Sequence, residues 1–141
     1  MFDFLSKTYS LKAEMREDVA VRILKRIVTI RETEEFIAGK IESRDARCPC
    51  HLAVGQEATP SVLAEFLNQE DRVYGTHRSH HQYLAITDDV EGLLAEVLGK
   101  KNGCAKWMGG SQHLINVRKG FGGSVPIAGG QSRLHAVLPW R

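Results

Sequence analysis

Three histidines and one arginine occur within one short polar segment of the sequence, His77-Arg78-Ser79-His80-His81. A guanidinium donates two parallel hydrogen bonds to a phosphate or carboxylate group, so an arginine flanked by imidazoles is typical of an anion-binding site. The adjacent histidines lack the i, i+4 spacing of a helical zinc pair, which weakens a metal site as the second interpretation. A solvated loop without a ligand is the third. The residue types alone leave all three interpretations open.

Two thiols and an imidazole follow one another in Cys48-Pro49-Cys50-His51. Thiolate and imidazole groups bind zinc, but the sequence has no second ligand pair at the spacing of a zinc finger, since the third cysteine, Cys104, stands alone. A pair of thiols without a metal is the interpretation that the pattern favours. Three cysteines also fit a reduced cytoplasmic protein better than a disulfide scaffold.

Eight glycines lie between Gly103 and Gly130. Within this stretch, the run 109–113 (GGSQH) offers backbone N–H groups that can cradle an oxyanion. The run lacks the lysine and hydroxyl ending of a P-loop and the spacing of a dinucleotide-binding fingerprint. The stretch is therefore either a surface where the backbone approaches a ligand closely or a set of turns between short strands. Linear order shows no serine–histidine–aspartate set, so a hydrolase is unsupported.

Two helices are expected to precede the basic segment. Apolar side chains at steps of four, four and three residues predict a long helix over residues 10–38 that ends near Gly39. These side chains are Val19, Ile23, Ile27 and Ile30. A second helix is expected over residues 56–67, with Pro60 near its first turn, where the missing N–H costs least. Its expected buried side consists of Val62, Leu63, Phe66 and Leu67.

A strand and a third helix are expected around the basic segment. Residues 72–76 predict a short strand, and no helix is predicted over the polar segment 77–82. Asp88 and Glu91 have the spacing of a capping box, which predicts the start of the third helix. Its apolar face consists of Leu93, Leu94, Val97 and Leu98.

The composition is that of one small folded domain. Apolar residues make up 43% of the 141 residues, which is enough to build a core. The formal net charge of +2 is too close to balance to indicate nucleic acid or an acidic membrane surface as a partner. No apolar run approaches the roughly 18–20 residues of a membrane span, and the first residues do not resemble a secretory signal. We expect a cytoplasmic protein.

Four segments, in this order and at these spacings, resemble one family. The chain is similar to the alpha subunit of the thiamine-diphosphate-dependent 2-oxo-acid dehydrogenases, which act on pyruvate, branched-chain 2-oxo acids or acetoin, and the resemblance runs from about Ile27 to Gln131. The segments are 51–58 (HLAVGQEA), 76–80 (THRSH), 103–113 (GCAKWMGGSQH) and 120–129 (GFGGSVPIAG).

The resemblance implies an α/β fold in which helices flank a parallel sheet. This chain would supply the N-terminal helical part and the first sheet edge, as a truncated portion, with an N-terminal helix over 1–40, a family-like region over 41–131 and a divergent tail over 132–141. The implied activity is that of an oxidoreductase: oxidative decarboxylation of a small 2-oxo acid on thiamine diphosphate, with acyl transfer to a lipoyl group. The implied partners are a beta subunit, in a heterotetramer, and a lipoyl-bearing acyltransferase.

Site residues follow from the resemblance position by position. His51 and His80 match histidines expected to be catalytic, and His113 ends the glycine–serine motif. Arg78 matches the arginine that holds the diphosphate, while His77 replaces the usual tyrosine of a Tyr-Arg pair. The full set expected to bind the cofactor is His77, Arg78, Asn116, Pro126 and Ala128.

Magnesium is implied with the cofactor, but no residue of this chain is expected to bind it. The family's ligands come from a Gly-Asp-Gly motif and a later asparagine, which we expect beyond Arg141. The strands that would cover the third helix are not expected either, which predicts partial exposure of Leu93, Leu94 and Val97. Two alternatives remain: a non-catalytic fragment that pairs with a beta subunit or a separate C-terminal half, and a small zinc module built on Cys48, Cys50 and the histidines.

Overall fold

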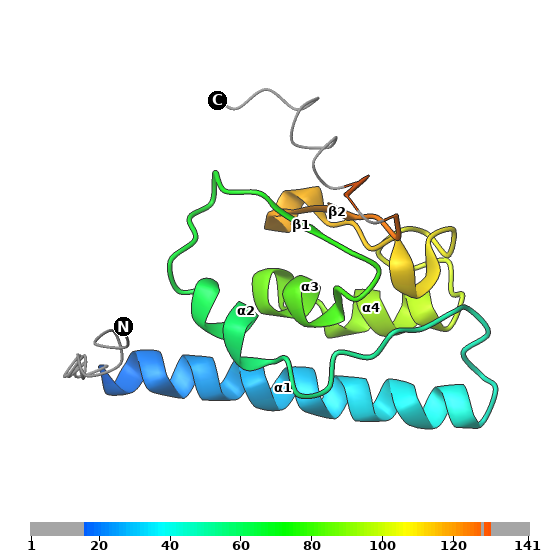
Figure 1. Ribbon diagram of the computed structural model, residues 1–141, viewed down its shortest axis with the longest axis horizontal. Helices are drawn as coiled ribbons and strands as arrows, with labels where there is room; N and C mark the ends of the chain where they lie inside the picture. Colours follow the sequence, from blue (N-terminus) through cyan, green and yellow to red (C-terminus); the bar gives the residue numbers. More distant parts are fainter. Residues whose placement is uncertain (1–15, 128, 131–141) are drawn as a thin grey trace, which may run out of the picture.

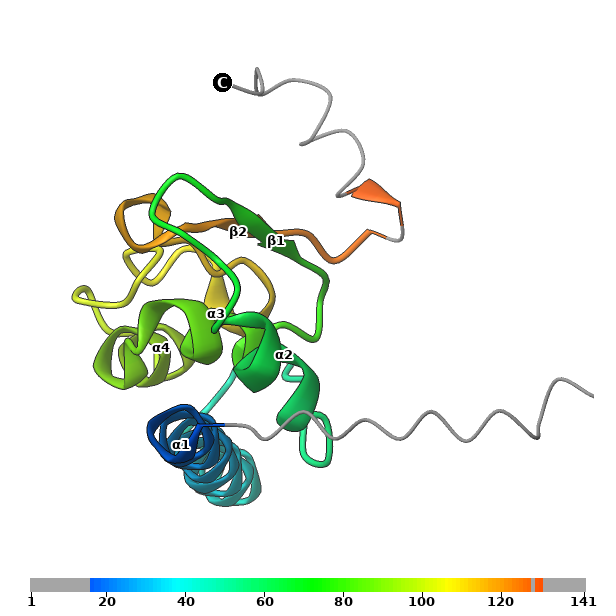
Figure 2. The ribbon, with the colours of Figure 1, turned by 90° about the vertical axis from the view of Figure 1, so that its left-hand side faces the viewer.

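The computed structural model describes residues 16–127, 129 and 130. Three layers succeed one another in Figures 1 and 2: helix α1, then helices α2, α3 and α4, and then a pair of short strands, β1 and β2. The helices therefore cover one side of the strand pair. The expected α/β class, a helical part with one sheet edge, is confirmed.

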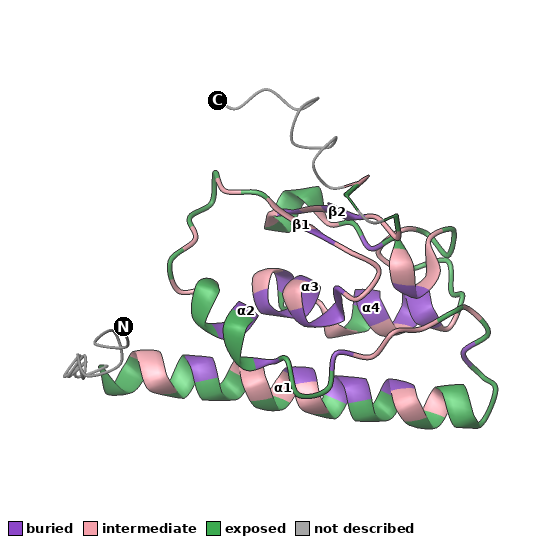
Figure 3. Ribbon diagram, in the orientation of Figure 1, coloured by how far each residue is buried: buried purple, intermediate pink, exposed green. Residues whose placement is uncertain are grey.

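Helix α1 (Glu17–Glu42) is the long helix that the apolar periodicity predicts. Its buried residues, purple in Figure 3, lie on the side of the helix that faces α3 and α4. The predicted end at Gly39 is wrong, because the cost of one exposed helical glycine, about 1 kcal/mol, does not stop a helix with a packed face. The helix ends where Arg44 adopts a positive φ of 62°. The predicted start at residue 10 lies outside the described residues.

Helix α2 (Ala58–Leu63) is shorter than expected and turns a different side inward. Pro60 and Ser61 are buried, whereas Val62 and Leu63 are exposed and Phe66 is 77% exposed. The predicted buried side is therefore wrong for these three apolar residues. The reason is that α2 packs on α1 and α3 through its proline side, which a local pattern cannot anticipate.

Helices α3 (His80–Thr87) and α4 (Val90–Val97) meet at a sharp corner. The sequence did not predict α3, because its first turn consists of polar residues that are buried only in the tertiary structure. Asp88 ends α3 with a positive φ of 50°, and Asp89 caps α4 by accepting from the N–H of Gly92, so the predicted cap is shifted by one residue. Leu93 and Val97 are buried, which makes their predicted exposure wrong, whereas Leu94 is partly exposed as expected.

Strands β1 (Val73–Gly75) and β2 (Phe121–Ser124) pair in parallel. The first confirms the strand expected over 72–76. Val73 faces Phe121 and Gly75 faces Ser124, with an irregularity after Val73. A parallel pair needs a crossover connection, which α3 and α4 supply. Both strands therefore end at the same edge, where the chain segments 76–78 and 125–127 emerge.

The core lies between the helical layer and the strands. Tyr83 of α3 packs edge-to-face on Phe121 of β2, with ring centroids 5.4 Å apart, an arrangement that aromatic pairs prefer. Leu114 and Leu93 complete this centre. Ile30 and Ile37 of α1 belong to the same core, which extends between α1 and the helices α3 and α4. Burial of these apolar side chains therefore holds the long helix against the other helices.

Candidate functional site

The carboxyl edge of the strand pair brings two predicted segments together. The segment with His77 and Arg78 leaves β1, and the segment with Pro126 leaves β2. The N–H of Val125 donates to the carbonyl oxygen of Gly75 at 3.1 Å, which binds the two exits to each other. Ligands of parallel α/β sheets bind outside the carboxyl ends of the strands. This edge is therefore the candidate site.

Arg78 is half-buried at this edge, and its guanidinium donates through Nη1 to the carbonyl oxygen of Leu52. The ring of His77 lies 4.9 Å from that of His51 in an edge-to-face contact. Among the described residues no carboxylate pairs with Arg78, so its positive charge is not neutralised by a neighbour. The structure thus gathers His51, His77 and Arg78 from two segments, with hydrogen-bond donors suited to an anion.

Two buried polar atoms in the residues that follow Arg78 in the chain have no hydrogen-bond partner among the described residues: Oγ of Ser79 and Nδ1 of His81. Burial lowers the pKa of His81, which favours the neutral form of its ring. A buried polar atom without a partner is costly, and a ligand or another part of the protein can satisfy it. Among these groups Arg78 supplies the positive charge that suits an anion.

A fully buried chain of hydrogen bonds runs through His80, the first residue of α3. Its Nδ1 lies 3.2 Å from the carboxylate of Glu34 on α1, and its Nε2 lies 2.7 Å from Oγ of Ser111. The order of groups is that of an acid–histidine–serine triad. However, Ser111 is only 1% exposed and His80 is fully buried, so a substrate has no access. These hydrogen bonds hold α1, α3 and the glycine-rich loop together.

The remaining predicted residues lie in other surroundings. Asn116 donates from Nδ2 to Asp89 at 3.1 Å, and Asp89 also accepts from the hydroxyl of Tyr83 at 2.7 Å. Burial and this bond to Asp89 raise the pKa of Tyr83. His113 is exposed, Pro126 is half-buried just after β2, and Ala128 lies outside the described residues. Asn116 is thus engaged within the fold rather than beside Arg78.

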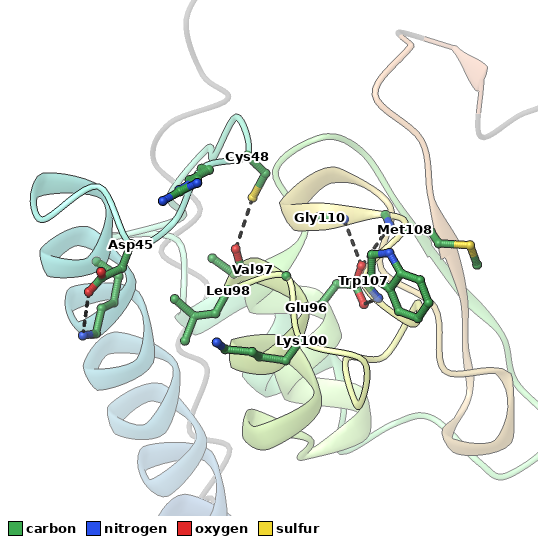
Figure 4. Close-up of a pocket in the computed structure, with 13 residues that line it drawn as sticks. Asp45, Cys48, Glu96, Val97, Leu98, Lys100, Trp107, Met108 and Gly110 are labelled. Carbon is green, nitrogen blue, oxygen red and sulfur yellow. Dashed lines mark hydrogen bonds and ion pairs between the residues drawn. The ribbon is translucent and has the colours of Figure 1, made fainter.

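Glu96 organises the glycine-rich loop from the inside (Figure 4). Its buried carboxylate accepts four backbone N–H groups at 2.8–3.0 Å, two at each oxygen. The donors are Ala105, Trp107, Gly109 and Gly110. The predicted oxyanion cradle is therefore filled by a carboxylate of the same chain at these positions.

Sequence reasoning missed Glu34 and Glu96, although a signal for both exists. Glu34 stands four residues after Ile30 and three before Ile37, on the apolar stripe of α1. Glu96 likewise stands between the buried Leu93 and Val97 of α4. A carboxylate on a buried face is rarely tolerated without hydrogen-bond partners, so each position indicates a buried polar network.

The zinc interpretation of Cys48 and Cys50 finds no support in the described part of the chain. No three His, Cys, Asp or Glu side chains there come together in a group that can hold a metal ion. No helix among the same residues combines the length and the apolar character of a membrane span.

Comparison with known proteins agrees with the sequence resemblance. A family model described as the dehydrogenase E1 component matches residues 25–138. The acetoin:2,6-dichlorophenolindophenol oxidoreductase alpha subunit of Bacillus subtilis is 38% identical over 80 residues, which are 57% of this chain and 24% of the relative. The subunit of the same name from Cupriavidus necator is 31% identical over 113 residues, which are 80% of this chain and 34% of the relative. The pyruvate dehydrogenase E1 component subunit alpha of Rickettsia bellii is 37% identical over 82 residues (58% and 25%).

The chain spans between a quarter and a third of the length of these relatives. The family model covers most of the chain, including the strand pair and the segment that carries Arg78. The resemblance to pyruvate and acetoin dehydrogenase alpha subunits is confirmed, and the chain belongs to the dehydrogenase E1 component family.

Proposed function

We propose that this chain is the cofactor-binding portion of the alpha subunit of a thiamine-diphosphate-dependent 2-oxo-acid dehydrogenase. One observation carries the proposal: Arg78, three residues after the end of β1, has a half-buried guanidinium that donates to the carbonyl oxygen of Leu52 and has no carboxylate partner among the described residues. A diphosphate is an anion that such a guanidinium binds through charge-assisted hydrogen bonds. The names of the pyruvate dehydrogenase relatives support the same reaction class.

The proposal gives each residue of the edge a role. Arg78 binds the diphosphate, and His77 donates a hydrogen bond beside it. Pro126 lines the same edge, and His51 faces the substrate across its contact with His77. When bound, the cofactor supplies the carbanion stabilisation that decarboxylation needs. Asn116 and Ala128 complete the proposed cofactor contacts, although Asn116 would first have to leave Asp89.

His80 takes a positioning role in this proposal. Its ring is fully buried and is held from both sides, by Glu34 and by Ser111. Because His80 begins α3 directly after Arg78 and Ser79, a fixed imidazole determines where the Arg78 backbone leaves the strand. The function proposed for His80 is therefore to orient Arg78 rather than to exchange protons with substrate.

The proposal extends to the assembly. A beta subunit would contribute the other wall of the cofactor site, and a lipoyl-bearing acyltransferase would accept the acyl group, in a cytoplasmic complex. The magnesium ion that accompanies the diphosphate needs hard oxygen ligands. We assign those ligands to the Gly-Asp-Gly motif and the later asparagine that the family resemblance implies, outside the described residues.

Pyrophosphate binding by the full chain tests the role of Arg78. Titration calorimetry should show that Arg78→Ala weakens the binding of inorganic pyrophosphate by roughly tenfold or more, as expected for about 1.5–3 kcal/mol of charge-assisted hydrogen bonds. Arg72→Ala is the matched control, because Arg72 is exposed and donates only to the carbonyl oxygens of Gln69 and Asp71. Equal losses in both variants would reduce the binding to nonspecific charge and contradict the proposal.

A second candidate, an interaction role through a beta subunit, rests on the outer face of α1. Val21, Leu24 and Val28 are each at least half exposed and lie on one side of the helix at steps of three and four residues. Contiguous apolar side chains on a surface helix mark contact sites. In this candidate the chain pairs with a beta subunit without contributing to turnover.

Co-purification tests the second candidate. Leu24→Gln should reduce recovery of the chain with a co-expressed beta subunit, whereas Lys25→Gln, on the neighbouring side of α1, should not. Turnover by the assembled pair separates the two candidates: decarboxylation of pyruvate that depends on Arg78 supports the enzyme role, and a stable complex without turnover supports the interaction role.

A further inference from the structure

Cys48 and Cys50 bring their sulfur atoms together in the segment that joins α1 to α2. The two Sγ atoms lie 3.6 Å apart, and both side chains are partly exposed. Cys48 lines an open cavity of about 820 Å³, together with Arg47, Lys100 and Trp107 (Figure 4). The sulfur of Cys48 points toward the carbonyl oxygen of Val97, at 3.5 Å.

We propose that Cys48 and Cys50 form an oxidative modification site, in which a peroxide converts the two thiols into one intramolecular disulfide. A sulfur–sulfur bond is about 2.05 Å long, so the two atoms must approach by about 1.5 Å. Rotation about the side-chain bonds supplies such a movement, because the contacts that the sulfur atoms would give up are weak. Cys48 bonds to the carbonyl oxygen of Val97 at 3.5 Å and to the backbone of Ser111, and Cys50 bonds to the carbonyl oxygen of Cys48 at 3.4 Å. The site stands on this geometry and does not depend on the proposed function.

The two thiols are unequal, which defines their order of reaction. The hydrogen bond from the Cys50 thiol lowers the pKa of Cys48 to about 6, against the opposing effect of burial. The same bond and burial raise the pKa of Cys50. Because the thiolate is the nucleophile, Cys48 attacks first and Cys50 follows. Burial raises the pKa of the third thiol, Cys104, which makes it an internal reference.

The chemistry balances with hydrogen peroxide as the oxidant. The Cys48 thiolate attacks one peroxide oxygen, the O–O bond breaks, and the sulfur becomes a sulfenic acid as hydroxide leaves and takes a proton. Cys50 sulfur then attacks the Cys48 sulfur, the S–O bond breaks, and the second oxygen leaves as water. Two thiols and one peroxide become one disulfide and two water molecules, and a dithiol reductant reverses the change.

Disulfide formation also reaches the anion-binding edge, and this consequence rests on the proposed function. His51 follows Cys50 directly, and the carbonyl oxygen of Leu52 accepts the hydrogen bond from Arg78. A shift of Cys50 toward Cys48 therefore pulls on both contacts. Oxidation is expected to weaken pyrophosphate binding, and a dithiol reductant is expected to restore it.

Peptide mapping of the full chain tests the disulfide. Trypsin cuts after Arg47 and Arg72, so both thiols fall in the peptide 48–72, while Cys104 falls in 102–106. After brief exposure to hydrogen peroxide, peptide 48–72 should lose the mass of two hydrogen atoms and fail to react with iodoacetamide. Peptide 102–106 should still be alkylated. Treatment with dithiothreitol before alkylation should restore both thiols.

Two variants separate the steps and keep the result interpretable. Cys50→Ser should stop at a sulfenic acid on Cys48 that dimedone traps, and Cys48→Ser should make Cys50 no faster to oxidise than Cys104. The proposal is overturned if Cys104 oxidises as fast as the pair, or if the products are disulfides between chains or sulfonic acids alone. A disulfide that forms without any change in pyrophosphate affinity would retain the modification site and remove only its link to Arg78.

Discussion

Nε2 of His80 lies 2.7 Å from Oγ of Ser111, although 31 positions separate the two residues in the chain. His80 begins α3, and Ser111 lies in the glycine-rich loop, so this contact joins the helical layer to the loop. Glu34 completes the connection to α1 from the other side of the imidazole. The side chains of Glu34, His80 and Ser111 are all buried, so water cannot replace the hydrogen bonds between them.

Removal of the Ser111 hydroxyl should destabilise the fold. Ser111→Ala leaves Nε2 of His80 buried without its partner, which costs about 1–3 kcal/mol of unfolding free energy. Urea denaturation of the two proteins measures the difference. Ser43→Ala is the control, because Ser43 is exposed and its substitution should change stability by no more than about 0.5 kcal/mol. Equal stability of the two variants would show that the imidazole has no need of Ser111.

Substitution of Glu96 by glutamine should loosen the loop 105–110. The carboxylate accepts four N–H groups, whereas an amide has one acceptor oxygen and presents its own N–H donors to the others. We expect the unfolding free energy to fall by about 3 kcal/mol or more. Hydrogen exchange at Ala105 and Gly109 should accelerate. Glu91→Gln, an exposed change on the same helix, should leave both exchange and stability unaltered, and a protected loop in the Glu96 variant would contradict the assignment.

The ion pair of Glu57 with Arg31 should make stability depend on acid pH. The hydrogen bond from Arg31, 2.7 Å from Oε1, lowers the pKa of Glu57 to about 2 from its ordinary 4.5. Because the folded-state pKa is depressed, the stabilisation is fully present above pH 4.5 and is lost as the pH falls toward 2. The Tm of Glu57→Gln should therefore lie below that of the parent at pH 7. The difference between the two Tm values should shrink as the pH falls from 4.5 to 2.

Exposed Glu70 is the control for that titration. Glu70→Gln should give a Tm that follows the parent across the same pH range. A Tm gap for Glu57→Gln that persists unchanged at pH 2 would mean that the loss comes from altered packing rather than from the carboxylate charge.

Two glycines should respond to alanine with opposite signs. A Cβ at Gly103 would lie 2.6 Å from Cα and 2.7 Å from the backbone N of Glu96, so Gly103→Ala forces backbone to move and should destabilise the fold by about 1–3 kcal/mol. Gly39 lies within α1 with nothing near its missing Cβ, so Gly39→Ala should stabilise by about 0.5–1 kcal/mol. Thermal unfolding of both variants measures the two effects, and a shift in the same direction would contradict the packing described at Gly103.

Local patterns predicted the elements whose exposed and buried faces repeat along the chain. The long α1 and the strand β1 follow from side-chain periodicity, because a period of 3.6 or 2 residues is a property of the backbone itself. The same reasoning failed for α2, whose periodic apolar residues face outward, and for α3, whose first turn consists of polar side chains. In both cases the neighbouring layer, and not the local pattern, determines which side is buried.

The sequence by itself determined the family, through four motifs in order, and it determined Arg78 as the candidate for an anion, because the chemistry of a guanidinium is carried by one residue. Only the tertiary structure decided which groups stand beside it. The parallel pairing of β1 and β2 brings Pro126 to the edge of Arg78, and the packing of α1 on α3 places Glu34 against His80. These residues are 46 or more positions apart in the chain. They meet only when the chain folds back on itself and buries its apolar side chains, so a local sequence pattern cannot predict the contacts.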